Sequence, residues 1–95
     1  HSGDPADVVY VKSIGRKVLV RLSDARVLES YAALAELEQQ LPGSFVRCHK
    51  SYLANMEHVV QASADGLVMD CDEAVPISQR QYRIVRDALR AFSAS

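Results

Sequence analysis

Three residues capable of nucleophilic or acid–base chemistry lie close together near the middle of the chain. Cys48, His49 and Ser51 share one short segment. Consecutive side chains on an extended strand point to opposite faces, so this adjacency separates the three groups instead of joining them. His58 and Cys71 add potential metal ligands, but no Cys-x-x-Cys or His/Cys cluster spacing accompanies them. We therefore expect no catalytic residues, no metal site and no cofactor.

Cationic side chains offer a stronger signal, because they are segregated along the chain. The formal net charge of −1 does not by itself favour a polyanionic partner. Yet ten of the eleven basic residues fall into three groups, and Asp87 is the one acid among them: Lys12, Arg16, Lys17 and Arg21; Arg47 and Lys50; Arg80, Arg83, Arg86 and Arg90. If the fold brings these groups together, one face of the protein becomes positive.

Two of these groups carry suitable chemistry for nucleic acid. The segment Arg47–Asn55 combines guanidinium, ammonium, hydroxyl and amide groups, which contact phosphates and base edges. The alternative is a polar turn that satisfies its own backbone. The third group lies on one side of an expected helix, where a solvated face would usually mix charges of both signs. An anionic lipid surface is disfavoured for this helix, because it lacks an exposed Trp or Phe anchor.

The elements that must position these residues are mostly strands. Residues 7–14 form a β-rich run closed by Gly15, and residues 17–22 alternate in polarity with a cationic face. A turn at 23–25 leads into a third strand over 26–29, which completes a meander. Residues 45–48 form a short apolar strand that leads into a polar segment over 49–55.

Two helices are expected, one mid-chain and one at the C-terminal end. Ser30 suits an N-cap for the first, whose apolar stripe is Leu34, Leu37 and Leu41, whose outer face carries Glu36 and Glu38, and whose end is the pair Pro42-Gly43. Ser78 and Gln81 form a capping box for the second, over 79–92, with an apolar arc of Tyr82, Ile84, Val85, Ala88, Leu89 and Phe92. Between them, Asp65-Gly66 predicts a hairpin, because this pair supplies positive φ angles.

One domain is the expectation for this length. The 95 residues, 48% of them hydrophobic, supply a single core. Residues 1–6 are interpreted as a linker or expression remnant, and 7–95 as the domain. No apolar run is long enough for a membrane span and no signal segment opens the chain, which predicts a cytoplasmic protein with no membrane contact by this segment. We interpret Cys48 and Cys71 as small core residues, not as a disulfide or redox pair.

Several ordered motifs resemble one known family. The run Phe45-Val-Arg-Cys-His-Lys-Ser-Tyr-Leu-Ala-Asn55 closely resembles the Phe-x-Arg-x-His-Arg-Ser-x-x-Val-Asn pattern of the LytTR DNA-binding domain family. The opening Asp7-Val-Val-Tyr-Val, the Leu34–Leu41 helix and Val75-Pro-Ile-Ser-Gln-Arg80 resemble further elements of that family. The likeness spans roughly residues 7–92. It implies a mostly β (α+β) fold, with antiparallel strands in an elongated sheet arrangement, two helices, and loops that enter successive major grooves of DNA.

Carried over by position, the resemblance assigns roles within the three basic groups. Base edges fall to Arg16, Lys50 and Arg80, because long cationic side chains suit guanine O6 and N7. Phosphate contacts and support fall to Lys17, Arg47, Ser51, Ser78, Gln79 and Arg83. His49, Tyr52 and Asn55 are expected to brace the loop from beneath. Lys50 and Gln79 stand where the family usually has Arg, and a Lys at position 50 gives up bidentate geometry.

The sequence thus predicts a double-stranded DNA-binding output domain of a bacterial transcription regulator that reads direct repeats. In such regulators a receiver or sensor domain commonly lies upstream, so a two-component response regulator is the expected setting. Monomers on tandem sites and a dimer are both consistent with the sequence. The rival interpretation is a protein-interaction domain that docks an acidic partner through the basic C-terminal helix.

Overall fold

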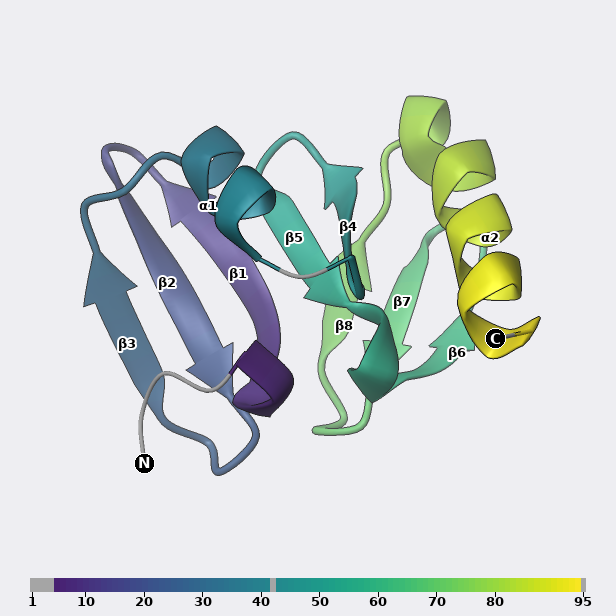
Figure 1. Cartoon of the computed structure of the whole chain (residues 1–95), viewed down its shortest axis with the longest axis horizontal. Helices are drawn as coiled ribbons and strands as arrows, with labels where there is room; N and C mark the ends of the chain where they lie inside the picture. Colours follow the sequence, from purple (N-terminus) through teal and green to yellow (C-terminus); the bar gives the residue numbers. More distant parts are fainter. Residues whose placement is uncertain (1–4, 42, 95) are drawn as a thin grey trace.

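The chain folds into two antiparallel sheets and two helices (Figure 1). The computed structural model describes residues 5–41 and 43–94. The elements in chain order are η1 (Pro5–Asp7), β1 (Val8–Ile14), β2 (Lys17–Leu22), β3 (Val27–Ser30), α1 (Leu34–Gln40), β4 (Phe45–His49), β5 (Tyr52–Asn55), η2 (Met56–His58), β6 (Val59–Ala62), β7 (Gly66–Met69), β8 (Ala74–Pro76) and α2 (Gln79–Ala94). The prediction of a mostly β fold with one helix mid-chain and one at the C-terminal end is confirmed.

The larger sheet has the strand order β3-β2-β1-β5-β4. Its first three strands are the expected meander, and Gly15 makes the β1–β2 turn with a φ of 60°, a conformation that glycine adopts without steric cost. The alternation predicted for β2 is also confirmed, since Val18 and Leu22 are buried. These two side chains and Leu34 of α1 belong to one apolar cluster, which fixes α1 on the sheet.

The segment 49–55, predicted as a polar segment, contains a turn and a buried strand. His49 ends β4, Lys50 and Ser51 form a tight turn, and Tyr52–Asn55 is the strand β5. β5 runs between β1 and β4, and Leu53, Ala54 and Asn55 are fully buried. Asn55 is tolerated there because its Nδ2 donates to Val8 O at 2.8 Å and its Oδ1 accepts from Glu57 N at 3.0 Å.

The smaller sheet has the order β6-β7-β8. The β6–β7 hairpin is confirmed, but the reason given for Gly66 is wrong. Among the described residues, positive φ angles occur at Gly15, Ala25 and Asp72, not at Gly66. A Cβ on Gly66 would lie 2.8 Å from Val75 O, so glycine is needed here for close approach to β8. β8 itself was not predicted from the sequence.

The first helix is shorter than expected and begins later. α1 has Ala33 at its N-cap, and no side chain caps it. Ser30 does not cap the helix, because it is the last residue of β3 and pairs with Val18. Pro42, expected to end this helix, lies outside the described residues.

The second helix matches its expected start. α2 begins at Gln79 and packs against β4, with Val85 only 1% exposed. Ile84 departs from the predicted apolar arc: it is 57% exposed, because it lies beside the arginine face and not over the core. No helix within the described ranges is long and apolar enough to cross a bilayer.

The N-terminal segment enters the fold earlier than position 7. Residues 1–4 of the expected linker lie outside the described residues, whereas Pro5 and Ala6 belong to η1. His58 Nε2 lies 2.8 Å from Ala6 O, and its Nδ1 lies 2.6 Å from Asp70 Oδ2. This histidine therefore links η1 to the turn that follows β7.

Candidate nucleic-acid interface

Three loops lie along one edge of the molecule, the upper edge in Figure 1. They are the β1–β2 turn, the β4–β5 turn and the start of α2. Backbone hydrogen bonds join their flanking strands: Ser13 N donates to Ser51 O at 2.7 Å, and Ser78 N donates to Cys48 O at 3.0 Å. We name residues 15–17, 50–51 and 78–80 the loop edge. The fold thus brings together parts of all three basic groups.

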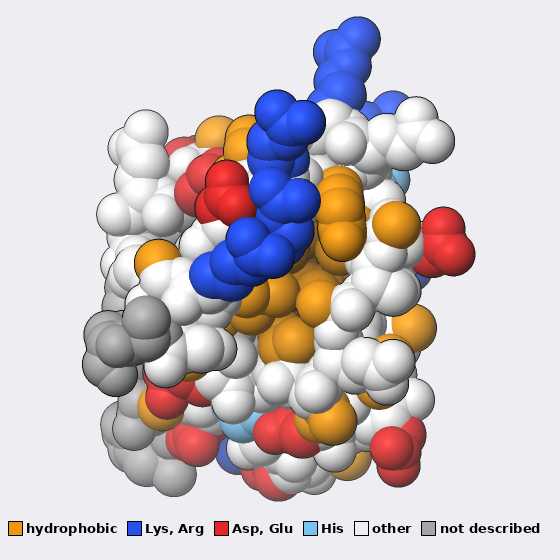
Figure 2. All heavy atoms as spheres, turned by 90° about the vertical axis from the view of Figure 1, so that its right-hand side faces the viewer, with side chains coloured by type: hydrophobic (Ala, Val, Ile, Leu, Met, Phe, Trp, Pro, Cys, Tyr) orange, Lys and Arg blue, Asp and Glu red, His pale blue; other side chains and the backbone are white. Residues whose placement is uncertain are grey.

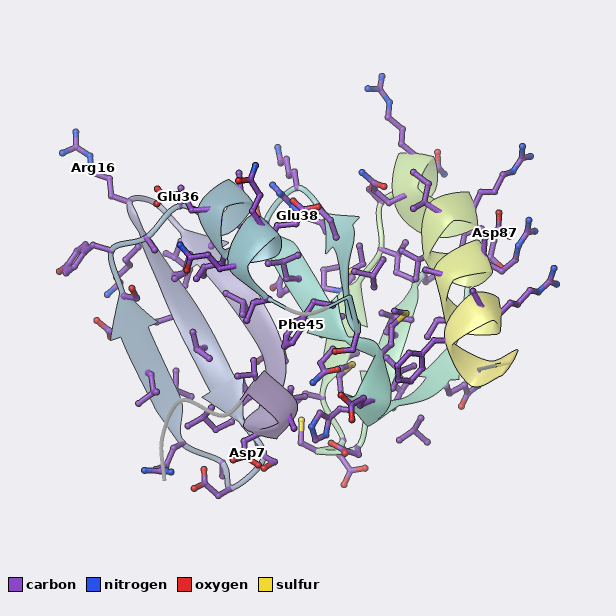
Figure 3. The ribbon with its side chains drawn as sticks, in the orientation of Figure 1. Asp7, Arg16, Glu36, Glu38, Phe45 and Asp87 are labelled. Atoms are coloured by element: carbon purple, nitrogen blue, oxygen red, sulfur yellow. The ribbon has the colours of Figure 1, made fainter. Side chains whose placement is uncertain are left out.

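The three residues predicted to read base edges all lie on the loop edge. Arg16, Lys50 and Arg80 are exposed, and Figure 3 shows Arg16 extending outward from the β1–β2 turn. Across the described part of the chain, no hydrogen bond or ion pair engages the side chains of these three residues. Their charges are therefore available to an anionic partner.

Arg47 is placed differently from the other cations. Its Nε donates to His49 O at 3.0 Å, its Nη2 to Lys50 O at 2.8 Å and its Nη1 to Glu38 Oε1 at 2.9 Å. The guanidinium is thus engaged with the backbone of the β4–β5 turn and with α1. This arrangement holds the turn that carries Lys50 and leaves Arg47 little capacity for a phosphate.

Of the three residues expected to brace this turn, His49 and Tyr52 lie next to it and Asn55 does not. His49 Nδ1 accepts from Ser51 N at 3.1 Å, and the His49 and Tyr52 rings meet edge to face with centroids 5.7 Å apart. Lys12 Nζ lies 5.8 Å from the centroid of the Tyr52 ring. Asn55 anchors the far end of β5 through its bonds to Val8 and Glu57.

The residues expected to contact phosphate differ in their exposure and in the contacts they already make. Lys17 Nζ lies 3.2 Å from Glu29 Oε1, but both side chains are at least a third exposed, so the pair is weak and can exchange. Gln79 and Arg83 are exposed on α2. Ser51 and Ser78 are half-buried, and their backbone atoms make the bonds that join the loops.

A concave surface of about 500 Å³ lies between the β1–β2 turn and α1. Arg16, Lys17, Arg47 and Lys50 contribute to its lining, together with Tyr31 and Glu36. Tyr31 is 83% exposed and follows β3. Tyr31 was not among the predicted site residues, and its position between a strand and the start of a helix is the sequence feature that could have identified it.

Arg21, a member of the first basic group, is not part of the loop edge. Its Nη1 lies 2.6 Å from Glu73 Oε2, and Tyr10 Oη donates to Glu73 Oε1 at 2.7 Å. The Tyr10 hydrogen bond and the Arg21 guanidinium hold the pKa of Glu73 below its usual range. Burial and the bond to Glu73 raise the pKa of Tyr10 to about 12. This cluster joins the two sheets, and its charges are matched.

Cys48 and His49, whose chemistry could in principle support catalysis, are not assembled into a catalytic site. Burial raises the pKa of the Cys48 thiol to about 12, so the sulfur stays protonated at neutral pH and is not a nucleophile. The Nδ1 of the neighbouring His49 is occupied by Ser51 N. Within residues 5–41 and 43–94, no three His, Cys, Asp or Glu side chains gather where they could hold a metal ion.

Comparison with known proteins identifies the family. The model of the LytTr DNA-binding domain matches residues 1–90. The chain belongs to the LytTR DNA-binding domain family. Sensory transduction protein LytT from Bacillus anthracis is 33% identical over 93 residues, covering 88% of this chain and 36% of that protein. The LytT protein from Oceanobacillus iheyensis is 30% identical over 95 residues, covering 92% and 39% respectively.

A solved structure agrees with the sequence comparisons. A LytTr DNA-binding domain from Bacillus cereus superposes with a TM-score of 0.82 at 29% identity, covering 92% of this chain and 84% of that one. The resemblance noted from the motifs is therefore confirmed, and the LytTR fold is the fold described above. This chain spans under two fifths of the length of the LytT relatives.

Proposed function

We propose that this LytTR domain binds double-stranded DNA in a sequence-specific manner by docking its loop edge on the duplex. The observation that carries the proposal is that three cationic loops, far apart in sequence, are joined by backbone hydrogen bonds along one edge. Within the described residues, Arg16, Lys50 and Arg80 present exposed cations whose side chains have no internal partner, and docking exchanges only the weak, exposed pair of Lys17 with Glu29. In this arrangement the loops enter successive major grooves.

Within this interface the side chains divide by what they can reach. Arg16, Lys50 and Arg80 read base edges, because their exposed cations project from the loops and can donate to guanine O6 and N7. Lys17, Ser51, Ser78, Gln79 and Arg83 contact phosphates and set the register. His49 and Tyr52 brace the β4–β5 turn, whereas Asn55 anchors the opposite end of β5. Arg47 joins this bracing set, since its guanidinium is occupied by the turn itself.

The domain acts as the output module of a bacterial response regulator in the cytoplasm. The similarity to proteins named for sensory transduction supports this setting, and the extra length of those relatives leaves room for an upstream receiver. The target is a pair of direct repeats, occupied by two monomers or by a dimer. The domain performs no catalysis of its own.

The experiment is a selection from a random duplex pool at two salt concentrations, followed by fluorescence-anisotropy titration of the recovered duplex. Enrichment of a repeated motif is expected, with an affinity that falls steeply with salt. Lys50→Ala or Arg80→Ala should weaken binding and relax selectivity at one position, by about 1–3 kcal/mol.

The matched control is Arg26→Ala. Arg26 is an exposed arginine in the β2–β3 turn at the opposite end of the molecule, paired with Asp24 at 2.7 Å. This change should leave DNA affinity untouched. No enrichment from the pool and no binding at low salt would overturn the proposal.

A further inference from the structure

The arginines of α2 extend well beyond the loop edge. α2 begins at that edge and runs away from it (Figure 1). Arg86 and Arg90 are six and ten residues beyond Arg80, which places them about 9 and 15 Å further along the axis at roughly 1.5 Å per residue. A duplex that docks on the loop edge meets the start of this helix and not its far half. The proposed DNA contacts therefore leave these two cations unused.

A shallow apolar hollow of about 220 Å³ opens beside this half of the helix. Tyr82, Val85 and Leu89 of α2 line it together with Ile77 and Ala62, and Arg86 and Arg90 contribute its cationic side. Figure 2 shows a ridge of Lys and Arg side chains running alongside an exposed hydrophobic depression on this flank. A helix packed fully on its own core would leave no such depression.

The surroundings of the hollow are apolar and cationic together. Ala62 of β6, which lines the hollow, is exposed, and the lining residues Tyr82 and Leu89 of α2 are half-buried. Arg86 has a weak pairing with Asp87 at 3.3 Å, and both side chains are at least two fifths exposed. In the described part of the chain, the side chain of Arg90 has no hydrogen bond or ion pair. Exposed apolar surface rimmed by charge is typical of a protein-docking site.

We propose that this hollow, with Arg86 and Arg90 as its rim, docks an acidic protein segment that carries apolar side chains. The charge of the rim selects acidic residues, and the hollow takes an aliphatic or aromatic side chain from the same segment. A DNA backbone would satisfy the arginines but has no apolar group to fill the hollow. The site is separate from the loop edge, so the domain can hold DNA and this partner at once.

The test is an NMR titration of the ¹⁵N-labelled domain with an acidic helical peptide whose leucines are spaced i, i+3, i+4 and i+7. Saturable shifts are expected at Ala62, Tyr82 and Leu89, with none at Arg16 or Lys50. A peptide of equal charge in which alanine replaces leucine should bind roughly tenfold more weakly, because the hollow stays empty. Equal affinity for the two peptides, shifts at the loop edge, or no saturation would overturn the proposal.

Two variants separate this site from the DNA site. R86E/R90E should weaken the leucine peptide roughly tenfold or more by reversing the charge of the rim. Ala62→Phe, a change at an exposed position, should fill the hollow and weaken the peptide while leaving DNA affinity at the wild-type value. If Ala62→Phe instead lowers DNA affinity and spares peptide binding, the hollow belongs to the DNA interface and the proposal fails. If the wild-type domain binds the leucine peptide but does not bind DNA, the proposed DNA-binding function is refuted and the docking proposal is not.

Discussion

Arg47 offers the sharpest discrimination between bracing a loop and contacting DNA. Arg47→Ala removes donors to His49 O and Lys50 O and the pair with Glu38. A hydrogen bond from a charged group contributes about 1.5–3 kcal/mol when well shielded. The Arg47 side chain is 27% exposed and that of Glu38 is 44% exposed. Each hydrogen bond to a carbonyl therefore contributes less than the shielded value, and the ion pair adds at most ~0.5 kcal/mol. We expect Arg47→Ala to lower the free energy of unfolding by about 2 kcal/mol.

Thermal unfolding followed by circular dichroism measures this loss. For a domain of this size, 2 kcal/mol corresponds to a fall in Tm of about 10 °C. DNA affinity should also fall, because the turn that carries Lys50 is no longer held. The salt dependence of binding should stay at the wild-type slope, since no phosphate contact is removed. Arg47→Lys should lose much of the stability as well, because an ammonium cannot span both carbonyls.

The opposite result would refute the bracing role. A side chain that contacts phosphate would leave Tm unchanged on mutation to alanine. It would also reduce the slope of log affinity against log salt by about 0.9, the value for one phosphate contact. Arg47→Lys would then bind DNA nearly as well as the wild type, since the charge is kept.

Three further predictions concern the scaffold. Gly66→Ala should destabilise the domain by about 1–3 kcal/mol in urea unfolding, because its Cβ would press on Val75 O at 2.8 Å, and an unchanged midpoint would contradict this. Asn55→Ala should cost about 1–3 kcal/mol by leaving buried backbone groups unpaired, and native stability would show that water replaces the side chain. Burial lowers the pKa of His58, but its hydrogen bonds to a backbone carbonyl and to Asp70 outweigh this effect and raise the pKa above 6.5. The stability that protonated His58 contributes to the fold is therefore complete below pH 6.5, and it is lost as the pH rises through the higher pKa of the folded state. Asp70→Asn should flatten that pH dependence in thermal unfolding, and an identical pH profile would contradict the assignment.

Strands with strong alternation and a helix with a clear start were predictable from the sequence. Val18 and Leu22 mark the buried face of β2, and Ser78 precedes a helix that begins at the next residue. The same local rules failed at Ser30, where strand pairing with Val18 prevailed over a capping preference. The polar composition of 49–55 did not predict the buried strand β5. The amide of Asn55 can be buried there because it bonds to Val8, far away in the sequence, and to Glu57 close by.

The candidate site was predictable in its residues but not in its assembly. Motif matching named Arg16, Lys50 and Arg80, yet only the sheet order and the bonds Ser13 N to Ser51 O and Ser78 N to Cys48 O show that their loops share an edge. The engagement of Arg47 was not predictable, because it depends on where α1 places Glu38. The hollow beside α2 also arises from long-range packing, so the hydrophobic periodicity of the sequence does not predict it.

Guanine methylation protection on the selected duplex tests the central claim most directly. Dimethyl sulfate attacks guanine N7, the major-groove acceptor that Arg16, Lys50 and Arg80 are proposed to contact. We predict protected guanines in successive major grooves on one face of the duplex, with Lys50→Ala removing protection in one groove only. Undiminished methylation of every guanine in the bound site would contradict docking of the loop edge in the major groove.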